Sequence, residues 1–168
     1  MGAKDFPSVR DIQNGAGMND IIDKLCWHIV KMFPHRSRVV RNYGEEYLLR
    51  FYIKHNGLLP GIYLHKFFQG DQDRELHNHP WMWSFSVILT GGYIEERKSN
   101  TGDVYTRHLK PGRLNLLSGK TFHRISLVDK GHGAWTIFCS GKKVKDWGFL
   151  ISETGEVIPH KQYLAERK

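Results

Sequence analysis

Hydrophobic residues recur at every third or fourth position near the start of the chain and then gather in short runs. The first pattern forms one apolar stripe at helical spacing. Its members are Ile21, Ile22, Leu25, Ile29 and Phe33. The stripe predicts a helix over residues 19–33, with Asn19 as its N-cap and Pro34 as the residue that ends it.

The pattern changes after this helix to short segments rich in β-branched and aromatic residues, which Gly, Pro, Asn and Asp separate. The segments are EEYLLRFYI, GIYLHKFF, SFSVILTGGYIEE, DVYTRHL, RLNLLS, HRISLV and AWTIFCS. They predict the strands of a β-sandwich or small barrel, with the first helix packed outside. The final residues HKQYLAERK predict a short terminal helix. Because no repeat or linker interrupts the pattern, we expect one domain over residues 18–168 and a flexible arm over 1–17.

Composition agrees with one globular domain, since the 168 residues are 40% hydrophobic and 12% aromatic. No apolar run approaches the roughly 20 residues of a membrane helix, and the N-terminus has no apolar signal core. We therefore expect a cytoplasmic protein without a membrane partner. Cys26 and Cys139 are too few for a disulfide framework and are expected to be free core thiols.

The formal net charge is +8, from 25 Lys and Arg against 17 Asp and Glu. A basic surface favours acidic small molecules, anionic surfaces or nucleic acid. The basic residues are spread along the chain, with only short clusters such as GKKVKDW. No helix-turn-helix, zinc-finger or RNP-like signature is present, so we expect a small-molecule substrate and no specific binding of nucleic acid.

The stretch HNHPWMWSF contains two histidines with one residue between them. In a strand, residues two apart share a face, so His77 and His79 project together while Asn78 points away. Pro80 cannot donate to a sheet ladder, which predicts a bulge or kink. His123 opens another predicted strand and adds a third imidazole. Three neutral imidazoles can bind Zn or Fe and leave positions open, whereas the alternative is a set of hydrogen-bonded structural histidines.

Other polar residues on the predicted strands allow simpler explanations. His65 and His108 could line the barrel, but we expect each to be a satisfied core or surface histidine. Glu95 and Glu96 follow a Gly-Gly turn and are expected to be solvated charges.

The segment that starts at Gly70 resembles the first of the two motifs of the cupin superfamily, G(X)5HxH(X)3-4E(X)6G. After Gly70 and one extra residue come His77 and His79. Ser84 stands where the motif has a glutamate ligand, and Gly91 matches the last glycine.

A second segment resembles the other cupin motif, G(X)5PxG(X)2H(X)3N. Gly112 and His123 match, and Gly119 lies one position early. Ser118 replaces the proline and Leu127 replaces the asparagine. The order and spacing of the candidate ligands therefore agree with both motifs.

The resemblance covers residues 45–150 and implies an all-β fold, a cupin-like antiparallel jelly-roll barrel with an N-terminal helix. The run DQDRELHNHPW is also similar to uncharacterised microbial and phage proteins with an HxHPW cupin domain. Because the cupin barrel hosts many functions, the fold alone does not name a reaction.

Cupins with three histidines and no acidic ligand resemble the thiol dioxygenases, such as cysteine dioxygenase. Those enzymes have a small residue at the glutamate position and a later His-Arg-apolar sequence, here His123, Arg124 and Ile125. They also hold the substrate carboxylate with an arginine before the first histidine, and Arg50 has similar spacing. Ser84 cannot form the Cys–Tyr crosslink of the animal enzymes.

The sequence thus predicts a metal-dependent cupin, first of all a mononuclear non-haem Fe(II) oxygenase acting on a small acidic or thiol-containing substrate. The expected metal ligands are His77, His79 and His123, and the expected substrate contacts are Arg50, Ser84, Trp83 and Tyr93. A metal-dependent isomerase or epimerase and a non-catalytic ligand-binding cupin are the alternatives. Fe(II) is the expected metal, with Zn, Mn or Ni as alternatives, and a homodimer is the expected assembly.

Overall fold

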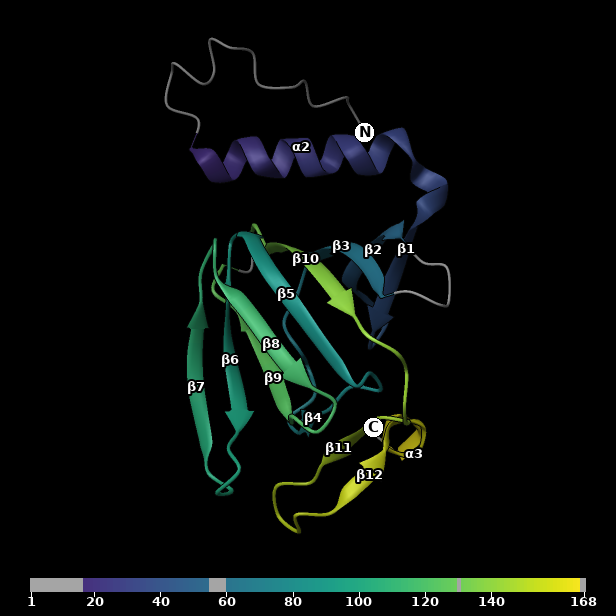
Figure 1. Ribbon diagram of the computed structural model, residues 1–168, viewed down its shortest axis with the longest axis vertical. Helices are drawn as coiled ribbons and strands as arrows, with labels where there is room; N and C mark the ends of the chain where they lie inside the picture. Colours follow the sequence, from purple (N-terminus) through teal and green to yellow (C-terminus); the bar gives the residue numbers. More distant parts are fainter. Residues whose placement is uncertain (1–16, 55–59, 130, 167–168) are drawn as a thin grey trace.

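The computed structural model describes residues 17–54, 60–129 and 131–166, which form two antiparallel sheets with helices at either end (Figure 1). The first sheet has the order β1 (Ser37–Asn42), β2 (Glu45–Lys54), β3 (Gly61–Phe67), β10 (Ala134–Ser140), β5 (Trp83–Thr90), β8 (Leu114–Ser118). The second has the order β12 (Val157–Pro159), β11 (Gly148–Leu150), β4 (Leu76–His77), β9 (His123–Leu127), β6 (Tyr93–Lys98), β7 (Val104–Leu109). The helical elements are α2 (Met18–Met32), the 3-10 turn η1 (Pro34–Arg36) and α3 (His160–Glu166).

The inner faces of the two sheets share one core, because side chains alternate along each strand. On β5, for example, Ser84, Ser86 and Ile88 are buried while the residues between them are half-buried. The apolar core between the sheets contains Ile88, Tyr93, Leu109, Ile125, Leu127 and Ala134. This arrangement confirms the predicted all-β barrel, and each of the seven predicted segments contains at least one strand.

Helix α2 covers the outer face of the first sheet. Cys26 and Val30 pack on a cluster that contains Leu49, Phe51, Leu64 and Trp135. Asp23 fixes the contact, since its Oδ1 accepts hydrogen bonds from Lys66 Nζ and Trp135 Nε1, both at 2.7 Å. The predicted helix is confirmed, but Asn19 as its cap is wrong. Gly17 is the N-cap, without a side-chain cap, and its carbonyl accepts from the backbone of Asp20 and Ile21.

The chain passes from the first sheet to the second through Gly91 and Gly92, which connect β5 to β6. Both have positive φ, 71° and 130°, a region that L side chains rarely adopt. A Cβ atom at Gly91 would lie 2.1 Å from the carbonyl oxygen of Gly133, so no larger residue fits this turn.

The C-terminal elements close the other end of the barrel from α2 (Figure 1). β11 and β12 are three residues each, and α3 confirms the predicted terminal helix. Cys26 and Cys139 are buried free thiols, as predicted. Among the described residues, no helix combines the length and apolar character needed to span a membrane. The predicted arm lies outside the described residues except for Gly17.

Candidate metal centre

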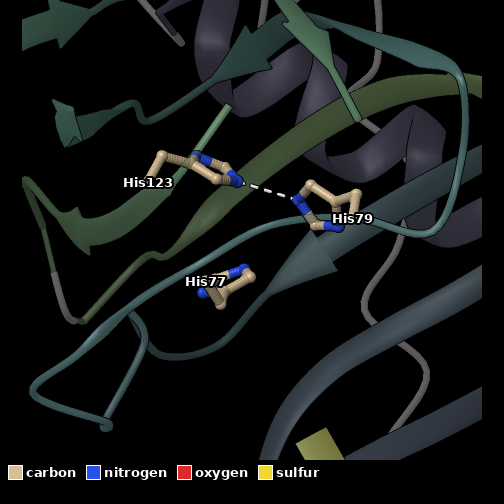
Figure 2. Close-up of side chains that lie close together, drawn as sticks. All are labelled: His77, His79 and His123. Atoms are coloured by element: carbon tan, nitrogen blue, oxygen red, sulfur yellow. Dashed lines mark hydrogen bonds between the residues drawn. The ribbon is translucent and has the colours of Figure 1, made fainter. Parts of the chain in front are cut away.

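Three histidines converge between the two sheets (Figure 2). His77 ends β4 and His123 begins β9, and these two residues lie directly opposite each other in the antiparallel pairing of the strands. His79 follows two residues after β4. One ring nitrogen from each histidine lies within 4.8 Å of the other two. The structure therefore brings together the three predicted ligands, in an arrangement that could hold one metal ion.

The backbone around Asn78 explains how His79 reaches this site. β4 ends at His77, so His79 comes from a loop and not from a strand, which differs from the prediction. Asn78 is buried, its N–H donates to the Gly148 carbonyl at 3.1 Å, and its Oδ1 accepts from Gly148 N at 3.0 Å. This double link directs Asn78 away from the histidines and fixes the loop that carries His79.

A carboxylate lies directly behind His123. Glu95 on β6 is fully buried at 0% exposure, and its Oε1 lies 2.8 Å from His123 Nδ1. An ionised carboxylate only accepts hydrogen bonds, so Nδ1 carries the proton. In the neutral ring Nε2 then carries a lone pair, which accepts a hydrogen bond from Nε2 of His79 at 2.8 Å (Figure 2). Glu95 thus selects the His123 tautomer that can bind a metal through Nε2.

Four groups hold Glu95 in its ionised form. Besides His123, its oxygens meet Arg97 Nη2 at 3.0 Å, Arg107 Nη1 at 3.2 Å and Asn115 Nδ2 at 2.9 Å. Burial alone would raise the pKa of Glu95, but the hydrogen bond and charge of His123, the Asn115 amide and the Arg97 guanidinium together lower it to about 2.

The expectation that Glu95 is a solvated turn charge is wrong. β6 pairs with β9 so that Glu95 lies opposite Ile125, two residues beyond His123. This register places Glu95 and His123 diagonally on the same inner face. Glu96 points to the other face, where it is half-buried and receives Arg124 Nη2 at 3.0 and 2.9 Å.

His77 and His79 are held in an environment that disfavours their protonated forms. Burial lowers the pKa of His77, the nearby Asp71 raises it, and the charge of His123 lowers it, which gives a value of about 4. Burial, followed by the charges of His123 and His77, brings the pKa of His79 well below its usual range. Both rings are therefore neutral at pH 7, as metal ligands must be.

The low pKa of His77 predicts that the metal-free protein loses folding stability in acid. Its pKa is 6.5 in its ordinary state and about 4 in the fold, so between these values the unfolded chain binds more protons. Stability should then fall as the pH drops through this window, by about 3 kcal/mol for His77 at roughly 1.4 kcal/mol per pKa unit. Urea unfolding of the metal-free protein at pH values above, within and below this window measures the slope of the unfolding free energy against pH. His77→Gln should reduce the slope, with His79 and His65 still contributing to it, whereas His108→Gln should leave it unchanged. An equal slope in His77→Gln would contradict the prediction.

The three histidines line a cavity of about 490 Å³ between the two sheets. Arg50 on β2 also lines it, with its guanidinium 5.2 Å from the ring centre of Tyr63. Arg50 Nε donates to Nε2 of His65 at 3.1 Å. Burial and then the charge of Arg50 bring the pKa of His65 well below its usual range. No described carboxylate forms an ion pair with Arg50, although Asp71 and Asp73 also line the cavity.

The four expected substrate contacts divide into two pairs. Arg50 and Tyr93 line the cavity, whereas Ser84 and Trp83 are absent from its wall. Trp83 lies on the outer side of β5, 36% exposed, and stacks on Phe85. Ser84 points inward but is buried at 2% exposure. Neither residue lines the cavity, so the structure gives no support to either as a substrate contact.

Comparisons with known proteins show a shared fold but do not show the family of this chain. No protein-family model matches the sequence, and no curated protein matches it. A crystal structure of Fe(II)-HppE with the alternative substrate (S)-1-HPP has a TM-score of 0.50 at 11% identity, over 64% of this chain and 57% of that one. Hydroxypropylphosphonic acid epoxidase from S. wedmorenis gives 0.49 at 12%, over 64% and 56%. KdgF from Halomonas sp. gives 0.42 at 16%, over 61% and 86%.

This chain thus spans a little over half the length of the HppE chain, with which it shares its fold. Together with the two antiparallel sheets, this likeness defines the fold as a cupin-like jelly roll with an N-terminal helix. It carries a three-histidine group that could hold a metal ion.

Proposed function

We propose that the protein is a metal-dependent cupin enzyme, a mononuclear non-haem Fe(II) oxygenase that acts on a small acidic or thiol-containing substrate. The observation that supports this best is the shared cavity, which is lined by the three histidines and by Arg50. A bound cation and a fixed guanidinium would together select an anionic substrate and hold it in one orientation.

The donor set fits Fe(II), and it fits Zn, Mn or Ni as well. His77, His79 and His123 would hold the ion through neutral nitrogens, which leaves its full +2 charge inside the cavity. When bound, Fe(II) would supply Lewis acidity and redox chemistry with oxygen. HppE, which shares the fold, is an Fe(II) protein by the name of its structure.

The residues of the chain itself would bind and orient the substrate. Arg50 Nε is taken by His65, so the two terminal nitrogens remain to receive a carboxylate as a fork. Tyr93, Trp81 and Phe138 form part of the cavity wall and would exclude water from the substrate. Asp71 lies near His77, with Oδ2 4.0 Å from Nδ1, which is beyond hydrogen-bond distance, and its charge raises the pKa of His77.

The test is metal analysis of protein prepared without added metal, followed by oxygen uptake of the Fe(II)-loaded protein. A panel of small carboxylic acids, with and without a thiol, serves as substrates. Iron in the isolated protein and oxygen uptake that depends on one of these acids would support the proposal. Conversion without oxygen uptake would favour an isomerase or epimerase, and binding without conversion would favour a non-catalytic ligand-binding protein.

Arg50→Ala is expected to raise the KM for a carboxylate substrate by about 10- to 100-fold, since a hydrogen bond to a charged group contributes about 1.5–3 kcal/mol. The metal content should stay normal. Arg38→Ala is the matched control, because Arg38 lies opposite Arg50 in the β1–β2 pairing but is exposed and outside the cavity. An unchanged KM in Arg50→Ala would remove Arg50 from the substrate site.

A further inference from the structure

A second hollow, of about 440 Å³, lies among the ends of β6, β7 and β8 and their turns. In Figure 1 the turn between β6 and β7 is at the end of the barrel away from α2. The hollow shares no lining residue with the metal cavity. Its volume is within the range of about 300–1,000 Å³ that is typical of sites for small molecules.

The charges that line this hollow are all positive. Arg97, Lys98 and Lys120 contribute three cations, and no carboxylate is among the lining residues. Neither lysine forms an ion pair with a carboxylate in the part of the chain that the structure describes. Lys120 also lowers the pKa of the neighbouring Lys145, after a larger effect of burial. The local potential therefore favours an anion.

Arg97 provides the buried end of the hollow. Its side chain is 13% exposed, and its Nη2 donates to Glu95 and to Asn115 Oδ1. Its Nε is buried and has no hydrogen-bond partner among the described residues. Glu95 is shared with Arg107, so two guanidiniums face one carboxylate. The cluster of Glu95, Arg97 and Arg107 therefore has a net charge of +1, which a bound anion would balance.

The other walls offer hydroxyls and a ring. In the turn after β8, beside Lys120, the hydroxyl oxygens Ser118 Oγ and Thr121 Oγ1 lie 3.0 Å apart. Tyr105 also lines the hollow and is 42% exposed. Phosphate oxygens accept hydrogen bonds from hydroxyl groups and from cationic side chains. The hollow is larger than a lone phosphate needs. We propose that it binds a small phosphorylated molecule, with the phosphate at Arg97, Lys98 and Lys120 and the remainder beside Tyr105.

The test is isothermal titration of the full chain at fixed ionic strength with inorganic phosphate and with adenosine monophosphate. We expect saturable binding with one site per chain, tighter for the monophosphate. Lys98→Glu/Lys120→Glu should weaken both by about tenfold or more, because charge-assisted hydrogen bonds are lost. Lys31→Glu/Lys110→Glu makes the same charge change at exposed residues outside the hollow and should bind as the parent does.

Absence of saturable binding, or equal weakening in both double variants, would overturn the proposal, the latter because only diffuse charge would then be involved. Binding to vesicles that contain phosphatidic acid, without binding of either free ligand, would also overturn it. Metal content is measured in parallel and should be unchanged in both variants. This site does not depend on the proposed oxygenase activity, so either can fail without the other.

Discussion

Changing any one of His77, His79 and His123 to alanine is expected to remove most of the bound metal, while the fold remains. Each histidine supplies one of three nitrogens within 4.8 Å of one another. With one removed, the remaining pair is a much weaker site for a divalent ion. The core between the sheets is built from other residues, so the chain should still fold. Metal content after equal loading with Fe(II), and circular dichroism for the fold, measure both effects.

Two variants serve as controls for this loss. Asn78→Ala changes the residue between two of the ligands and should keep the metal, because the backbone hydrogen bond from Asn78 N to the Gly148 carbonyl still holds the loop. Gly148 N loses its side-chain partner at a cost of about 1–3 kcal/mol. His108→Ala removes an exposed histidine of β7 and should change neither property. Full metal content in all three single ligand variants would make the histidines structural, and the proposed oxygenase would fall with them.

Glu95→Gln is expected to weaken metal binding by about 10- to 100-fold, the usual effect of removing the outer partner of a histidine ligand. The carboxylate requires the proton on His123 Nδ1, whereas the amide of glutamine can donate to that nitrogen and favour the other tautomer. The same change leaves Arg97 and Arg107 without their shared counter-charge. Loss of a buried partner of this kind costs about 3–5 kcal/mol of stability.

Two measurements separate these effects of Glu95. Titration with metal gives the affinity, and the ¹⁵N chemical shifts of His123 in the metal-free protein give its tautomer. Glu96→Gln is the matched control on the same strand, because Glu96 pairs with Arg124 on the opposite, half-buried face. Glu96→Gln should lose less than about 1 kcal/mol of folding stability, the usual contribution of a partly exposed ion pair, and it should bind metal normally. An unchanged His123 tautomer together with normal affinity in Glu95→Gln would exclude the positioning role.

The sequence alone was sufficient for features that depend on neighbours along the chain. The apolar stripe before Pro34 predicted α2 because a helix repeats every 3.6 residues. The seven segments of β-branched and aromatic residues each contain a strand, since a strand needs only local alternation. The spacing of His77 and His79, with His123 after a turn, also identified the three histidines that the structure brings together.

Tertiary structure decided what depends on pairing between distant segments. β4, β11 and β12 are only two or three residues long, too short to show a period. Glu95 looks like a turn charge in the sequence, and only the β6–β9 register places it behind His123. The hydrogen bond between Arg50 and His65 likewise follows from the pairing of β2 with β3. Register sets which side chains meet across strands, and it is fixed by packing of the whole core, which no local pattern contains.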